Sequence, residues 1–255
     1  MPDSVPASLT ETFASLVPSV LIMALFIEIF AVFNAFDTTL PEFIFIFLAP
    51  TLKAADSLFF TIIMTLFIHV FWFFGIHDAV FGGILGHIRD GNLSLNAAAS
   101  LAGETLPAIF TTPFYVYFVI IGGAGSVLAL AILLVRSKSK QLKNVGSIGL
   151  LPSFFGISEP IIFGVPIMLN PVIFIPFIFT SVANGTIAFL LMKFGFVGKS
   201  FAMFSWSMPS IFGAFLSTLD IRAMLLIVGL ILLDMLMYYP FFKAYEKQLL
   251  KEENQ

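Results

Sequence analysis

The chain has 255 residues, of which 59% are hydrophobic and only 11% charged, and its mean hydropathy is +1.05. Soluble domains carry about 25% charged residues, so this chain has too few charges to cover a surface that faces water. The net charge of −3 gives no support to nucleic-acid binding, and the absence of cysteine excludes disulfides and thiolate chemistry. We therefore expect an integral membrane protein that uses no metal or other cofactor.

Five apolar stretches are long enough to cross a bilayer, which takes about 20 residues. They are residues 13–36, 58–76, 114–135, 171–192 and 221–242. The ionisable side chains inside these stretches are Glu28, His69 and Asp234. Because a charged group that faces lipid is costly, we expect all three to face protein or water.

Residues 39–57 contain two prolines and are too short to span, so we expect an interfacial or short connecting helix there. The first twelve residues lack a basic region followed by a short apolar core. No cleaved signal peptide is expected from such a beginning.

Three stretches between the spans are interrupted by glycine, proline and polar residues. Residues 78–113 contain GGILG, DGN and TLPAIFTTP; residues 146–170 read GSIGLLPSFFGISEPIIFGVPIMLN; residues 200–219 contain SWSMPS. Irregular backbone at membrane depth survives only where protein buries it or where it lines a wet cavity. We interpret the first two stretches as re-entrant helical hairpins, about 78–113 and about 146–170. The expected fold is therefore an all-α membrane protein of about five transmembrane helices plus two such hairpins.

Basic residues indicate the orientation in the membrane. One group follows the third span in RSKSKQLK, at Arg136, Lys138, Lys140 and Lys143. The other follows the last span, at Lys243, Lys247 and Lys251. Positive charge concentrates in the cytoplasm, so both regions and the C-terminus are expected there. Counting spans backwards then places the N-terminus outside the cell, which suggests an odd number of further spans upstream.

The most informative motif is GISEPIIFGVPIMLNP at 156–171, in which Glu159 and Pro160 stand in an otherwise uncharged stretch. A carboxylate at membrane depth costs several kcal/mol unless it is protonated or hydrogen-bonded. Glu159 is therefore predicted to accept hydrogen bonds from ligand hydroxyls or to exchange a proton with a ligand. A second interpretation, compatible with the first, is that it caps a helix that starts at Ile161.

A second motif, HVFWFFGIHDAVFGG at 69–83, places two histidines about two helical turns apart. His77 lies where a span gives way to a hairpin and is predicted to donate to, or exchange protons with, a polar ligand. The alternative is a histidine whose ring bonds a backbone carbonyl at a helix end, and for His69 this packing role is equally supported. We interpret His87, Arg89 and Asp90 as a solvated loop.

The two tryptophans receive different interpretations. Trp206, in FSWSMPSIFGAF, can offer an aromatic face to a ligand ring or can anchor the chain at the lipid headgroups. Trp72, in WFFG, is interpreted as a packing residue.

The motifs WFFGIH, RSKSKQLK, GISEPIIFGVPIMLNP and YYPFFKAYEKQLLKEE occur in this order. Together they resemble enzyme IIC, the membrane subunit of the lactose, cellobiose and N,N′-diacetylchitobiose branch of the bacterial phosphotransferase system. The resemblance covers residues 1–255 and implies the C-terminal, sugar-binding part of a dimeric permease. Dimer contacts would come from N-terminal spans that precede this part.

By this resemblance, Glu159 corresponds to the glutamate that binds the sugar hydroxyl to be phosphorylated, and His77 and Trp206 correspond to family motif residues. Ser158 and Asn170 complete the set of predicted substrate-binding residues, with Glu159 and His77 as catalytic residues. Gly156, Ile157 and Ser158 replace the usual Asn-Ile-Asn, and Asp78 replaces a common glycine. These departures bear on the identity of the sugar and on activity.

The resemblance implies a bacterial cell-membrane permease that binds a disaccharide and holds its hydroxyl for attack on a phosphocysteine of a partner IIB subunit. The RSKSKQLK segment is the candidate contact for IIB. A proton- or ion-coupled secondary transporter would also contain broken helices and a buried carboxylate. A truncated, non-functional permease fragment is the third interpretation, and the sequence leaves the choice of sugar open.

Overall fold

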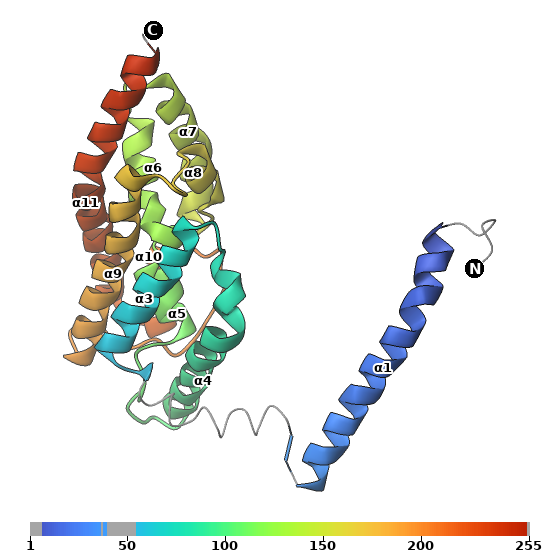
Figure 1. Ribbon diagram of the computed structural model, residues 1–255. Helices are drawn as coiled ribbons and strands as arrows, with labels where there is room; N and C mark the ends of the chain where they lie inside the picture. The colour runs from blue at the N-terminus through green and yellow to red at the C-terminus, as the bar shows by residue number, and fades with distance from the viewer. Residues whose placement is uncertain (1–6, 37, 40–54, 254–255) are drawn as a thin grey trace. The chain divides into compact units, whose positions relative to one another are not determined.

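The computed structural model describes residues 7–36, 38–39 and 55–253 (Figure 1). Most of the connecting helix predicted over 39–57 lies outside these residues. The chain divides into two units, 1–53 and 54–255, which are described separately. In the first unit, the 29-residue helix α1 (Ala7–Ala35) contains the first predicted span.

The second unit is helical, and no strand occurs among the described residues, as predicted for an all-α membrane protein. Its elements are α3 (Leu58–Phe73), η1 (Asp78–Phe81), α4 (Gly82–Leu101), α5 (Thr112–Phe114), η2 (Tyr115–Val119), η3 (Ala124–Ser126), α6 (Val127–Val135), α7 (Lys140–Phe154), α8 (Glu159–Gly164), α9 (Pro171–Lys193), α10 (Ser210–Thr218) and α11 (Ile221–Glu253). Helix α9 packs against α3 and α11, and α6 packs against α7 and α11 (Figure 1).

Four described segments are long and apolar enough to cross a membrane: Leu16–Ala35, Thr112–Val135, Pro171–Lys193 and Ile221–Lys251. The second predicted span, 58–76, forms α3, which is apolar but only 16 residues long. At about 1.5 Å per residue, α3 covers about 24 Å, less than a typical hydrocarbon core. The number of spans therefore stays a prediction.

The third predicted span is a broken helix. A π-helical turn ends at Val119, and the chain then passes through Gly122, Gly123 and Gly125 at φ of 78°, 100° and 75° before α6 begins. A side chain would not fit, because a Cβ on Gly125 would lie 2.1 Å from the Phe177 ring. The apolar pattern predicts a span at 114–135 but not this interruption.

Side chains from neighbouring helices bind the backbone groups that the break leaves unpaired. The Gly125 amide donates to Nε2 of His69 at 3.0 Å, and Nδ1 of His69 donates to the Thr65 carbonyl at 2.7 Å. The Gly125 carbonyl accepts from the hydroxyls of Thr180 (3.0 Å) and Tyr238 (2.6 Å). His69 thus has the packing role that the sequence left open.

Ser126, the residue immediately before α6, makes a second set of hydrogen bonds to neighbouring segments. Its hydroxyl donates to the Val119 carbonyl at 2.9 Å and accepts from Nδ2 of Asn184 at 3.0 Å. The same Asn184 amide group donates to Asp234 at 2.8 Å. His69 and Asp234 are fully buried, which confirms that these two ionisable residues face protein.

The predicted hairpin regions are more regular than their glycines suggest. Residues 82–101 form one 20-residue helix, α4, followed by an extended return whose Ala108 and Phe110 backbone groups bond Asn96 and Asn92. The second region forms α7 and α8, with a turn at Gly156 (φ 82°). Helix α7 begins at Lys140, so the basic RSKSKQLK segment is helical from that residue onward.

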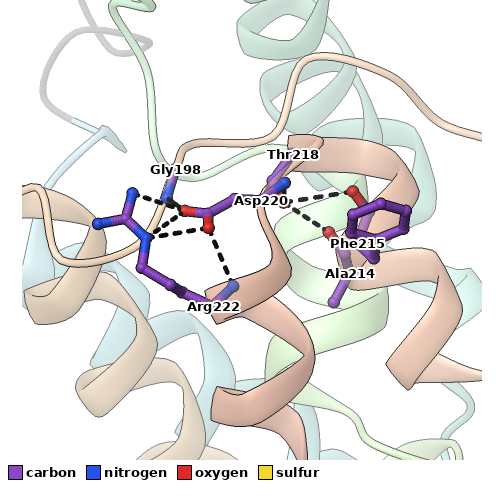
Figure 2. Close-up of polar contacts among 6 residues, drawn as sticks. All are labelled: Gly198, Ala214, Phe215, Thr218, Asp220 and Arg222. Atoms are coloured by element: carbon purple, nitrogen blue, oxygen red, sulfur yellow. Dashed lines mark hydrogen bonds and ion pairs between the residues drawn. The ribbon is translucent and has the colours of Figure 1, made fainter.

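Asp220 fixes the corner between α10 and α11 (Figure 2). Its carboxylate accepts hydrogen bonds from the Gly198 amide at 2.8 Å, the Arg222 amide at 2.9 Å and the Arg222 guanidinium. The hydrogen bond from the Arg222 side chain lowers the pKa of Asp220. These contacts hold the start of the segment 198–209, which carries Trp206.

The break predicts unequal effects of two glycine substitutions. Gly125→Ala places a Cβ against Phe177 at a positive φ, and we expect it to destabilise the protein by about 2–5 kcal/mol. Gly229→Ala is the control, because a Cβ at that site in α11 meets nothing within 4 Å. Thermal unfolding in detergent should show a lower midpoint for Gly125→Ala only. Equal midpoints for the two variants would show that the break tolerates a side chain.

Candidate functional site

Two open cavities meet at Glu159. The first chamber has a volume of about 510 Å³ and includes Phe163 and Met208 in its lining. The second chamber has a volume of about 460 Å³ and includes His77 and Arg89. Five residues line both chambers: Ile120, Gly123, Gly156, Glu159 and Trp206. The broken span, the α7–α8 turn and the segment before α10 therefore form the wall that the chambers share.

Glu159 is the first residue of α8, with Pro160 next to it. The capping interpretation is wrong, because the helix begins at Glu159 and not at Ile161, its N-cap is Ser158, and no side-chain capping hydrogen bond is formed. Glu159 lies instead in the first turn, where a helix N-terminus favours a negative charge, and its side chain, 44% exposed, borders both chambers. The α7–α8 turn approaches the broken span closely, since a Cβ on Gly123 would lie 2.6 Å from Cβ of Ser158. The break thus sets the depth at which Glu159 lies.

His77 ends the turn after α3 and caps η1 by accepting the Ala79 amide on Nδ1 at 3.0 Å. A neutral ring then carries its proton on Nε2, which lies 3.8 Å from Oε1 of Glu159. This distance is too long for a direct hydrogen bond, so the Nε2–H donor of His77 and the carboxylate acceptor of Glu159 are both available to a ligand hydroxyl. Asp78 lies 3.0 Å from Nδ1 and can pair with a protonated ring.

Trp206 lies in the irregular segment before α10, and its side chain is 57% exposed. The segment is held by Tyr117, whose hydroxyl donates to the Ser205 carbonyl at 2.8 Å and accepts the Ser205 amide at 3.3 Å. Tyr117 reaches Ser205 across Gly213, where a Cβ would lie 2.4 Å from the tyrosine ring. Trp206 thereby presents an aromatic surface to both chambers, which favours the ligand-binding interpretation.

The remaining predicted residues separate into two groups. Ser158 is buried, lines the second chamber, and its hydroxyl has no hydrogen-bond partner among the described residues. Asn170 lines neither chamber, and its side-chain oxygen caps α9 by accepting the Val172 amide at 3.0 Å. His69 serves the broken span and also lines neither chamber.

Two residues of the second chamber differ from their sequence interpretation. The prediction of a solvated loop at His87, Arg89 and Asp90 is wrong, because all three residues belong to α4. His87 and Asp90 are exposed, but Arg89 is only 7% exposed. Trp72 does pack against the His77 ring, at 4.5 Å between centroids, but it also lines the chamber. Its indole N–H is buried without a hydrogen-bond partner. Arg89 lies four residues after the buried Leu85 and three residues before the buried Asn92, and this helical spacing could have indicated its burial. The glycines around it mask the signal.

The chambers combine carboxylates, N–H donors and an indole face over an apolar wall. Such a mixture of acceptors, donors and an aromatic surface suits a neutral polyhydroxylated ligand better than an apolar one. No cluster of His, Asp and Glu residues that could hold a metal ion occurs in the described part of the chain.

Comparisons with known proteins agree with the motif resemblance. The family model described as Phosphotransferase system, EIIC matches residues 1–181. The Lichenan permease IIC component of Bacillus subtilis (strain 168) is 35% identical over 260 residues, covering 100% of this chain and 58% of the relative. The PTS system lactose-specific EIICB component of Staphylococcus aureus (strain N315) is 33% identical over 258 residues, covering 99% and 45%.

A solved structure shows the same arrangement of helices. The crystal structure of the transporter ChbC, the IIC component from the N,N′-diacetylchitobiose-specific phosphotransferase system, superimposes with a TM-score of 0.83 at 29% identity. The likeness covers 100% of this chain and 60% of ChbC. The chain thus spans between 45% and 60% of the length of these three proteins.

The contact between Tyr117 and Ser205 predicts the mobility of Trp206. In a Trp72→Phe background, Trp206 is the sole tryptophan, and removing the Tyr117 hydroxyl by Tyr117→Phe should release its segment. We expect acrylamide to quench the fluorescence of Trp206 more strongly in this variant. Tyr239→Phe, which changes an exposed tyrosine of α11, is the control. Unchanged quenching in Tyr117→Phe would mean that other contacts hold the segment.

Proposed function

The chain belongs to the EIIC family of the phosphotransferase system, and we propose that it forms the sugar-binding part of a disaccharide permease. The observation that carries the proposal is the position of Glu159. This carboxylate borders two chambers and lies 3.8 Å from the N–H donor of His77. Lactose and N,N′-diacetylchitobiose, which are both disaccharides, appear in the names of two similar proteins, and this supports a disaccharide as the substrate.

In the proposed reaction, a sugar hydroxyl occupies the space between Glu159 and His77. The carboxylate accepts the hydroxyl proton in a hydrogen bond, and Nε2–H of His77 donates to the hydroxyl oxygen. That oxygen attacks the phosphorus of a phosphocysteine on a IIB partner, the P–S bond breaks, and the proton passes to Glu159. Since phosphoryl transfer depends mainly on positioning and charge stabilisation, a fixed acceptor and donor are what the permease must supply.

Further proposals concern assembly. A IIB partner is supported by the name of the lactose-specific relative, an EIICB component. We also propose that regions 78–113 and 146–170 act as re-entrant hairpins that enclose the sugar, because residues of both regions, Asp78 and Glu159 among them, line the second chamber. Homodimerisation through spans outside this chain follows from the family resemblance.

The C-terminus is proposed to be cytoplasmic, together with the basic segment Arg136–Ser139. Two carboxylates of α11 join these regions: Glu246 accepts from the Ser137 hydroxyl at 2.6 Å, and Glu253 accepts from the Ser139 hydroxyl at 2.6 Å. Both basic regions therefore lie on one side of the protein, as the positive-inside rule requires.

This orientation has a direct test. A reporter enzyme that is active only outside the cytoplasm should be inactive when it is fused to the C-terminus. The same reporter should also be inactive when it is inserted after Lys138. An active reporter at either position would reverse the proposed orientation.

The role of Glu159 predicts a loss of transport. Glu159→Gln keeps the shape of the side chain but removes the proton acceptor, so phosphoenolpyruvate-dependent uptake of a disaccharide should fall at least about 100-fold. The measurement uses membrane vesicles that contain the permease, its IIB partner and the general phosphotransferases. Glu104→Gln is the control, because Glu104 is exposed and lines neither chamber.

The outcomes separate the alternatives. Normal uptake by Glu159→Gln would remove this residue from the mechanism. Uptake that is driven by an ion gradient without phosphoenolpyruvate would instead identify a secondary transporter. A wild-type chain that neither binds nor takes up sugar in the presence of its missing spans would be a non-functional fragment.

A further inference from the structure

Arg89 is a buried cation in the second chamber and lies six residues after the motif at 69–83. Helix α4 carries it, its side chain is only 7% exposed, and it lines the same cavity as Glu159. The guanidinium carbon lies 4.4 Å from the centroid of the Tyr115 ring. This cation–π contact holds the guanidinium over the ring, and its N–H donors lie at the edges of the guanidinium plane.

The donors of Arg89 have no acceptor among the described residues. No hydrogen bond or ion pair of this side chain is present there, and the buried Nε–H is without a partner. Neither nearby carboxylate bonds the guanidinium: Asp90 accepts the Thr112 hydroxyl, and Asp78 lies 3.0 Å from Nδ1 of His77. Since a buried charged donor without an acceptor is costly, the chamber is incomplete without an oxygen supplied by a ligand.

The charge of the second chamber indicates which chemical class of ligand oxygen can bind Arg89. Three carboxylates line the chamber, on Asp78, Asp90 and Glu159, against the single guanidinium of Arg89. A ligand carboxylate or phosphate would therefore meet net repulsion, whereas a hydroxyl, ring or carbonyl oxygen accepts a hydrogen bond without added charge.

We propose that Arg89 is a specificity-determining residue that donates hydrogen bonds to a neutral oxygen on the second ring of a disaccharide, whose first ring is held at Glu159. The inference rests on the proposed function, because it assumes a sugar hydroxyl at Glu159. Arg89 then selects neutral disaccharides over monosaccharides, which do not reach it, and over sugars with an anionic second ring.

The test is calorimetric binding of cellobiose, glucose and an anionic disaccharide with a uronic acid as its second ring. Wild-type protein should bind cellobiose most tightly. Arg89→Met should weaken cellobiose binding about 10- to 100-fold and glucose binding less than about 3-fold, since a hydrogen bond to a charged group is lost only for the larger ligand. Arg136→Met, at an exposed arginine outside both chambers, should change neither affinity.

Each other outcome has a definite meaning. Equal weakening of cellobiose and glucose in Arg89→Met, or no weakening, would overturn the inference, as would tighter binding of the anionic disaccharide by the wild type. If Arg89→Met does not fold, Arg89→Lys keeps the charge but not the planar donors and should still weaken cellobiose selectively. Failure of wild-type protein to bind any of the sugars would contradict the proposed function itself.

Discussion

The arrangement of the second unit depends on how the broken span at 120–126 satisfies its backbone. In a membrane, an unpaired amide or carbonyl has no water to bond, so a break persists only where other groups replace the helical hydrogen bonds. Here α3 supplies His69, α9 supplies Thr180 and Asn184, and α11 supplies Tyr238. The same contacts that keep the break intact tie three helices together, so stability and the shape of the site have one origin.

The break also explains why glycines cluster in IIGGAGS. Gly123 allows the α7–α8 turn to approach, and Gly125 allows the Phe177 ring to approach. Through the first contact, Ser158 and Glu159 reach the chamber wall; through the second, α9 packs beneath it. A larger residue at Gly123 would displace the turn that carries Glu159.

The sequence predicts the class of fold and the central pair of the site, but it does not predict the break or Arg89. Long apolar runs and an isolated Glu-Pro dipeptide are strong signals, because lipid penalises every exception to apolar composition. The break lies at glycines inside an apolar run. These glycines do not lower the hydropathy of the run enough to mark the break, and only the structure shows which side chains pack against them. The sequence does not predict the burial of Arg89, because its neighbours His87, Asp90 and Gly91 are typical of a loop. These residues nevertheless lie on a regular helix.

Glu159 and Trp206 stand on the wall common to both chambers. A solute in either chamber therefore borders the same carboxylate and the same indole, so the two compartments share one hydrogen-bond acceptor and one aromatic edge.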